Sequence, residues 1–148
     1  MRSDPTSIHS VAASSRELKG ECPRYVDSEV WSRIQYCDRI RRVVSHVANH
    51  PHEPTNLDSL ASVGCMERTS FSRLFRSKIG ITLREFLHVY RVANAKVLME
   101  ATDISLTEIA YAVGFSSFAT FERTFKKVSG SAPSVYRTNA LARARQVS

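Results

Sequence analysis

The stretch GFSSFATFERTFKK, residues 114–127, carries the pattern of one short amphipathic helix. With about 100° of rotation per residue, its apolar side chains fall on one stripe: Phe121, Phe125 and Val128, with Phe118 at the edge. The opposite side carries Ala119, Glu122, Arg123 and Lys126. Ser117 suits the N-cap and Gly130 the C-terminal stop, since a hydroxyl satisfies a free backbone N–H and glycine enters the left-handed region without strain. One face therefore requires a hydrophobic core, and the other is either simply solvated or faces an anion such as DNA.

The same pattern occurs earlier in the chain. Five residues recur 50 positions later: Phe71, Arg73, Phe75, Gly80 and Phe86 correspond to Phe121, Arg123, Phe125, Gly130 and Tyr136. Upstream, LDSLASVG (57–64) recurs as LTEIAYAVG (106–114) at a spacing of 49, so the additional residue lies in the turn. Each copy predicts a short helix, a tight turn, a second helix, a glycine stop and a segment with an aromatic residue. Two short helices joined in this way form a helix-turn-helix unit.

The segments around the two copies also have helical patterns. Residues 83–101, LREFLHVYRVANAKVLMEA, contain no Gly or Pro and predict one long, rigid linker helix. Residues 28–48 carry apolar side chains at helical spacing and predict another helix, closed by the loop NHPHEP. Ser105-Leu-Thr-Glu108 is a capping box for the first helix of the second copy, and Thr55 or Asn56 serves the first copy.

These patterns predict an all-α fold of about seven helices, with two homeodomain-like helix-turn-helix subdomains joined by a long linker helix. The expected division is a flexible N-terminal segment 1–27, a first subdomain 28–82, a linker helix 83–101, a second subdomain 102–138 and a basic C-terminal tail 139–148.

The composition is that of a basic globular protein. The 148 residues are 43% hydrophobic and suffice for one domain or two very small ones. The formal net charge of +7 favours a polyanionic partner, although it also serves solubility. Residues 1–27 carry equal numbers of acidic and basic residues, so the whole excess lies beyond residue 27. The charge is local, as a binding surface requires.

The cysteines and the hydropathy pattern indicate a cytoplasmic protein. Cys22, Cys37 and Cys65 are an odd number without close pairing, unlike a secreted disulfide framework. Cys37 is expected in the core of the first helix, and Cys65 in the turn before the first recognition helix. No apolar segment has the pattern of a signal peptide or a membrane span.

The quoted segments resemble the DNA-binding domain of the AraC/XylS family of bacterial transcription regulators. The resemblance is carried by LASVGCMERTSFSRLFRSKIG, FLHVYRVANAKVLM and IAYAVGFSSFATFERTFKKVSGSAPSVYR, and it covers roughly residues 28–138. It implies two helix-turn-helix subdomains and sequence-specific binding to double-stranded promoter DNA. Two recognition helices on one rigid helix can occupy successive major-groove segments about 34 Å apart, which predicts an asymmetric site for a monomer.

The resemblance places two sets of residues at the DNA-facing surface. In the first recognition helix they are Arg68, Thr69, Ser72, Arg73 and Arg76. In the second they are Phe118, Ala119, Thr120, Glu122, Arg123 and Lys126. Arg73 and Arg123 can donate two hydrogen bonds to guanine or hold a phosphate. Glu122 can accept from cytosine N4, or turn back to orient Arg123 or Lys126.

The chain departs from the family pattern at four positions. Glu67 stands where the first recognition helix usually begins with Ser, and Cys65 replaces the usual Gly before Met66. Phe118 takes a commonly polar position, where it either contacts a thymine methyl or extends the core. Ala119 offers only apolar contact. The first recognition helix is therefore expected to be held less rigidly, and the second to differ in specificity.

Other residue groups predict no metal, cofactor or enzyme. His46, His50 and His52 are close in sequence, and the first two are an i, i+4 pair, but no further ligand is evident and a helix C-terminus nearby explains them. A Gly-rich phosphate loop, a paired carboxylate cluster and a supported Ser/His/Asp arrangement are all missing from the sequence.

The sequence thus predicts a DNA-binding transcription regulator, expected to be an activator that also contacts RNA polymerase. The alternative is a helical adaptor or anti-activator that binds RNA polymerase or another regulator, and a third candidate is a nonspecific nucleoid protein. No small-molecule effector domain is evident, so the chain is either a stand-alone regulator or a piece of a longer, gated one.

Overall fold

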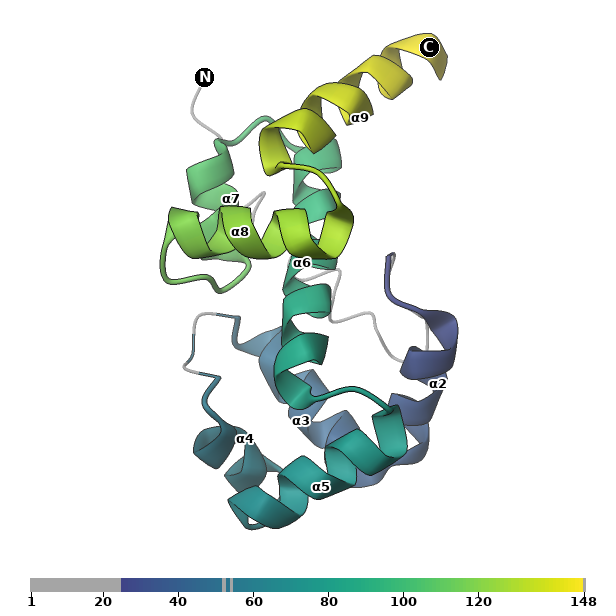
Figure 1. Cartoon of the computed structure of the whole chain (residues 1–148), viewed down its shortest axis with the longest axis vertical. Helices are drawn as coiled ribbons and strands as arrows, with labels where there is room; N and C mark the ends of the chain where they lie inside the picture. The colour runs from purple at the N-terminus through teal and green to yellow at the C-terminus, as the bar shows by residue number, and fades with distance from the viewer. Residues whose placement is uncertain (1–24, 52, 54, 148) are drawn as a thin grey trace.

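The computed structural model describes residues 25–51, 53 and 55–147. Over these residues the chain is all-helical (Figure 1), with eight helices and no strand: α2 Ser28–Tyr36, α3 Asp38–Asn49, α4 Leu57–Val63, α5 Arg68–Ile79, α6 Leu83–Ala101, α7 Leu106–Ala112, α8 Phe118–Ser129 and α9 Pro133–Val147. The predicted all-α fold is confirmed, and α6 has the predicted bounds of the linker helix. The pairs α4–α5 and α7–α8 are the first and second helix-turn-helix units.

Helix α6 joins two separate hydrophobic cores. Figure 1 shows α2–α5 around one end of this helix and α7–α9 around the other. Phe86 and Tyr90 of α6 belong to the first core, whereas Leu98 and Met99 belong to the second. A capping box of Thr82 and Glu85 begins the helix. Because both cores pack on the same rigid element, α6 fixes the relation between the two units.

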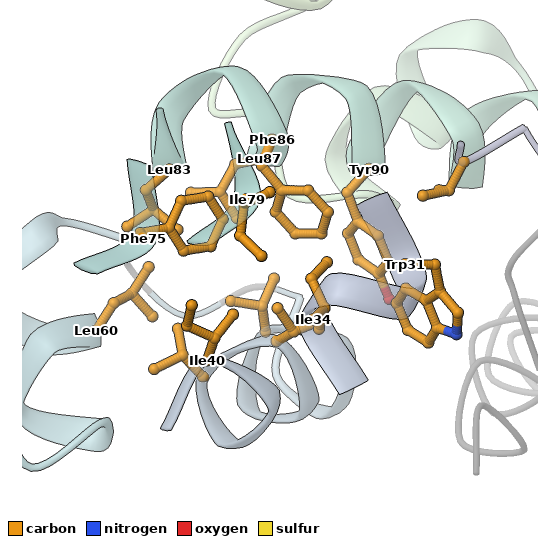
Figure 2. Close-up of a cluster of buried hydrophobic side chains, with 14 of the residues drawn as sticks. Trp31, Ile34, Ile40, Leu60, Phe75, Ile79, Leu83, Phe86, Leu87 and Tyr90 are labelled. Atoms are coloured by element: carbon orange, nitrogen blue, oxygen red, sulfur yellow. The ribbon is translucent and has the colours of Figure 1, made fainter. Parts of the chain in front are cut away.

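A chain of aromatic rings forms the centre of the first core. The ring centroids of Phe71 and Phe75 lie 6.2 Å apart, those of Phe75 and Phe86 5.8 Å, and those of Phe86 and Tyr90 5.8 Å. Figure 2 shows Phe86, Leu87 and Tyr90 pointing from α6 toward Ile34 and the neighbouring apolar side chains. The inner stripe of α5 is therefore held against α6 by aromatic contacts.

The second core repeats this arrangement. Phe115, Phe121, Phe125 and Tyr136 follow one another with centroid distances of 5.4, 5.7 and 5.6 Å. Tyr136 lies on α9, so α9 supplies an aromatic ring to the second core, as α6 supplies Phe86 to the first. The Tyr136 hydroxyl also donates to Glu100 Oε1 of α6 at 2.8 Å. The predicted repeat thus extends to a third helix in each unit.

The predicted helix 28–48 is wrong in one respect, because it is broken into α2 and α3 at Cys37. The backbone of Cys37 is extended, with φ −112° and ψ 107°. The break allows the two short helices to bury different side chains in the first core, with Trp31 and Ile34 from α2 and Ile40 from α3. Cys37 itself packs against this core, as expected.

The two ends of the chain are described to different extents. The segment 139–148, expected as a basic tail, is helical as far as Val147, where α9 ends, with exposed side chains from Leu141 onward. No Gly or Pro follows Pro133 to stop the helix. The predicted flexible segment 1–27 lies outside the described residues except for its last three, among which Val26 is buried.

Candidate nucleic-acid interface

Helix α5 presents a polar face to solvent. The residues predicted to contact DNA are all exposed: Arg68, Thr69, Ser72, Arg73 and Arg76. The opposite side of the helix buries Phe71, Phe75 and Ile79. At the C-terminus Gly80 adopts the left-handed region at φ 93°, which ends the helix. The pattern therefore separates a core face from a face available to a partner.

The arginines of α5 differ in their partners. Arg68 forms an ion pair with Asp58 of α4, with Nη1 3.6 Å from Oδ2, and both side chains are largely exposed. In the part of the chain that the structure describes, Arg73 and Arg76 have no carboxylate partner. Their guanidinium groups extend from the second and third turns of α5 and can bind a base edge or a phosphate.

Helix α8 begins with a complete cap. The Ser117 hydroxyl accepts from the backbone N–H of Thr120 at 3.2 Å and donates to the Thr120 hydroxyl at 2.9 Å. Gly130 ends the helix at φ 83°, so both predicted boundaries are confirmed. Thr120 is half-buried and serves this cap. Phe118 is also half-buried and packs on the second core, with its centroid 5.9 Å from Phe121, which favours the core role over a fully exposed contact.

The remaining predicted residues of α8 are exposed: Ala119, Glu122, Arg123 and Lys126. Among the described residues, Glu122 forms no ion pair with Arg123 or Lys126, so the alternative in which it orients them is not observed. The expected place of Val128 on the buried stripe is wrong. Val128 is 37% exposed, because it lies in the last turn of α8, and Thr124 is buried in the body of the helix instead.

The turns of the two units differ at one equivalent position. Met66 N–H donates to Ala61 C=O in the first unit, and Phe115 N–H donates to Ala110 C=O in the second. This pairing makes Cys65 equivalent to Gly114. Both have left-handed backbones, with φ 57° at Cys65 and φ 105° at Gly114. A side chain on Gly114 would lie 2.5 Å from the carbonyl oxygen of Pro51, whereas Cys65 is exposed.

Arg91 of α6 bridges the two units, a role that the sequence analysis missed. Its guanidinium donates to the Thr55 hydroxyl, just before the first unit, and lies 5.7 Å from the centroid of the Phe115 ring in the second unit. Arg91 and Pro51 both lie against the turn at Gly114. The signal in the sequence was a basic residue interrupting an apolar helix. The junction between the units is therefore packed as well as linked by α6.

The histidine group is closer to a metal site than its sequence spacing alone indicated. Among the described residues, His46, His50 and Glu53 place one potential ligand atom each within 4.8 Å of one another. His46 Nε2 lies 3.0 Å from Glu53 Oε2, and His50 Nδ1 lies 3.0 Å from the His46 carbonyl oxygen. These contacts, with the stacked imidazole rings, account for the group without a metal. His52 lies outside the described residues.

None of the helices in the described residues combines the length and apolar character that crossing a membrane requires.

Comparisons with known proteins place the chain among helix-turn-helix regulators. Residues 60–139 match the helix-turn-helix domain family. An uncharacterized HTH-type transcriptional regulator of Staphylococcus aureus is 33% identical over 100 residues, which are 68% of this chain and 13% of that protein. The regulator YbfP of Bacillus subtilis is 28% identical over 105 residues, 71% of this chain and 36% of that protein. The chain thus spans a minor part of these relatives.

Solved structures show the same architecture. The DNA-binding domain of AdpA, a global transcriptional factor solved in complex with a target DNA, has a TM-score of 0.69 and 34% identity, covering 74% of this chain and 99% of that domain. An AraC-type regulator from Chromobacterium violaceum has a TM-score of 0.62 and 26% identity, covering 69% of this chain and 91% of that one. These matches are to DNA-binding domains and not to enzymes. The chain belongs to the AraC family of helix-turn-helix DNA-binding transcription regulators.

Proposed function

We propose that the chain binds an asymmetric promoter site, with α5 and α8 in successive major-groove segments of the duplex. The main support is the equivalent exposure of Arg73 and Arg123 on two recognition helices that one rigid helix holds together. The similarity to the AdpA domain, which was solved with its target DNA, favours the same class of partner. The proposed division into units is 28–82, 83–101 and 102–138.

Base recognition is assigned to the exposed polar residues of the two helices. Arg73 and Arg123 donate to guanine O6 and N7, and Glu122 accepts from cytosine N4. Arg68, Arg76 and Lys126 hold phosphates, and Thr69 and Ser72 contribute hydroxyl contacts. Ala119 and the exposed edge of Phe118 offer apolar contact to a thymine methyl, whereas Thr120 first has to leave its cap contact.

The direct test is selection of bound sequences from a random duplex library, carried out with the purified chain at two salt concentrations. Two sequence blocks about one helical turn apart are expected. A single block would mean that only one recognition helix selects bases. The absence of any motif would contradict the proposal and favour an adaptor that binds RNA polymerase or another regulator.

Arg123→Ala is expected to abolish selection at the second block while the protein stays folded, because the side chain is exposed and outside the core. Loss of one bidentate guanine contact lowers discrimination by about 1–3 kcal/mol. Arg39→Ala is the control, since it removes an exposed cation from α3, outside both recognition helices. Unchanged selectivity in Arg123→Ala would contradict the assigned role.

We also propose that the protein activates transcription by contacting RNA polymerase. Transcription in vitro from a promoter carrying the selected site upstream is expected to increase with the protein, and the increase should disappear with Arg123→Ala. Repression, or no change at saturating protein, would contradict activation but not DNA binding.

A further inference from the structure

A hollow with a basic lining lies beside the first turns of α6, and Ser72 is the one predicted recognition residue that lines it. Its volume is about 420 Å³. The apolar part of the lining consists of Leu57, Leu83 and Leu87, and the polar part of Thr55, Ser72, Thr82, Arg84, His88 and Arg91. None of the lining residues is acidic. Ser72 lies on the exposed face of α5, so the hollow adjoins the predicted DNA-contacting surface.

The basic residues of the hollow come from one face of α6. Arg84, His88 and Arg91 are spaced by four and three residues, which brings them onto neighbouring turns of the same side. Lys127 of α8 contributes a further cation from the second unit, close enough to act on His88. Arg91 is held in place by Thr55 and the Phe115 ring. The hollow is therefore formed by the first unit and α6, on a side of α6 where Lys127 of the second unit lies close enough to act on His88.

The electrostatics of His88 report an excess of positive charge. Burial lowers the pKa of His88, and the nearby Arg84, Arg91 and Lys127 lower it further. Burial also lowers the pKa of Arg91. Cations kept close together without a carboxylate destabilise one another, and an anion in their midst removes this repulsion.

We propose that this basic hollow binds a phosphate of the DNA backbone, in the stretch of duplex between the segments contacted by α5 and α8. The inference rests on the proposed function, and it adds Arg84 and His88 to the DNA-binding surface. Such a contact carries no base information, but it fixes the register of both recognition helices on the duplex. The DNA backbone is favoured over a free phosphate because Ser72, a predicted DNA-contacting residue, lines the hollow and Lys127 of α8 lies close enough to act on His88.

The first test measures affinity for the selected site as a function of salt. Arg84→Ala combined with His88→Gln is expected to weaken binding about three- to tenfold and to make the salt slope shallower by about one phosphate contact. The selected motif should stay unchanged. Arg39→Ala, which removes an exposed cation from α3, is the control and should leave the salt slope unchanged. An unaltered affinity and slope in the double variant would overturn the inference.

The second test removes the charge from the DNA. Single methylphosphonates are placed at each phosphate between the two sequence blocks. One or two positions are expected to weaken binding of the unaltered protein several-fold, with no further loss in the Arg84→Ala/His88→Gln variant. Equal losses in both proteins, or no sensitive position, would overturn the inference while the motif still supports the proposed function. Competition by millimolar inorganic phosphate that is lost in the double variant would assign the hollow to a free anion instead.

The third test uses pH. His88 has a lowered pKa in the free protein, and a bound phosphate favours the charged imidazole, so binding takes up a proton. Affinity should therefore rise as the pH falls from about 8 to about 6, and His88→Gln should lose this increase while His50→Gln keeps it. The same pH dependence in His88→Gln would contradict a phosphate at this position.

Discussion

The two helix-turn-helix units have the same core but different beginnings to their recognition helices. In the second unit, Gly114 occupies the left-handed turn position and Ser117 caps α8. In the first unit, Cys65 occupies the equivalent position, and Glu67 precedes α5 without a side-chain cap hydrogen bond. A left-handed residue other than glycine costs about 1–2 kcal/mol, and a missing cap about 1 kcal/mol. The first recognition helix thus depends more on its core than on local contacts.

The two units are alike in their cores and differ in their turns. Phe71 and Phe75 correspond to Phe121 and Phe125, and all four are completely buried. The turn positions meet different surroundings. Gly114 faces Pro51 and Arg91 at the junction between the units, whereas Cys65 is exposed and its Sγ accepts from Arg42 Nη1 at 3.5 Å. The left-handed position is therefore more closely enclosed in the second turn than in the first.

The largest expected effects come from the cores. Phe125→Ala should destabilise the second unit by about 3–5 kcal/mol, and Phe75→Ala should do the same for the first, because each removes a completely buried ring. Hydrogen exchange in α8 and α5, measured for each variant, shows which unit opens. We expect opening confined to the mutated unit and to the end of α6 that packs on it.

Val128→Ala is the control on the same helix, since this side chain is exposed, and it should change stability by less than about 0.5 kcal/mol. Equal opening of both units in Phe125→Ala would mean that the two cores unfold together. A melt of Phe125→Ala like that of the unaltered protein would contradict the second core itself.

The next largest effect is a difference in stability between substitutions at the two equivalent turn positions, Gly114 and Cys65. Gly114→Ala should cost more than about 2 kcal/mol, because alanine is strained at φ 105° and its Cβ would lie 2.5 Å from the Pro51 carbonyl oxygen. Cys65→Ala, at the equivalent position, keeps a Cβ where one already exists and should change stability by less than about 0.5 kcal/mol. Urea unfolding of both variants gives the difference. Equal costs would show that the turns are equally constrained, and would remove the asymmetry argued above.

Much of the fold followed from the sequence because it depends on local rules. The spacing of phenylalanines by four residues, at Phe71 and Phe75 and again at Phe121 and Phe125, predicted the repeated core. The absence of breakers gave the bounds of α6, and the sequence also identified the capping residues Ser105 and Ser117 and named Asn56 as one of two candidates; all three accept a backbone N–H of their helix. The persistence of α9 beyond residue 138 was equally available, since no Gly or Pro follows Pro133.

The features that were missed depend on distant neighbours. Cysteine is not a helix breaker, and the break at Cys37 follows from the packing of Trp31 and Ile34 against other helices. Arg91 meets Thr55 across 36 residues of sequence, so no local pattern indicates the contact. The exposure of Val128 depends on where α8 leaves its core. For the residues expected to contact DNA, the sequence predicted which face of each recognition helix they occupy. Their contact with bases stays a prediction.

The smallest expected effects come from the N-caps of the two recognition helices, Ser117 at α8 and Glu67 at α5. Ser117→Ala should destabilise α8 by about 1 kcal/mol, because it removes the acceptor for the Thr120 N–H. Glu67→Ser should stabilise α5 by less, about 0.5 kcal/mol, since the new cap is partly offset by losing a carboxylate at a helix N-terminus. Both are measured by thermal unfolding without DNA.

Glu67→Gln separates these two contributions, because it removes the charge without supplying a short capping side chain. It should leave the unfolding free energy unchanged or slightly lower, while raising DNA affinity at low salt as Glu67→Ser does. Sequence selectivity at the first block should increase only in Glu67→Ser, because a capped N-terminus restricts the motion of α5 and therefore the position of Arg73. An equal change in selectivity for both variants would assign the effect to charge, and would mean that the missing cap has no influence on how the first unit recognises its site.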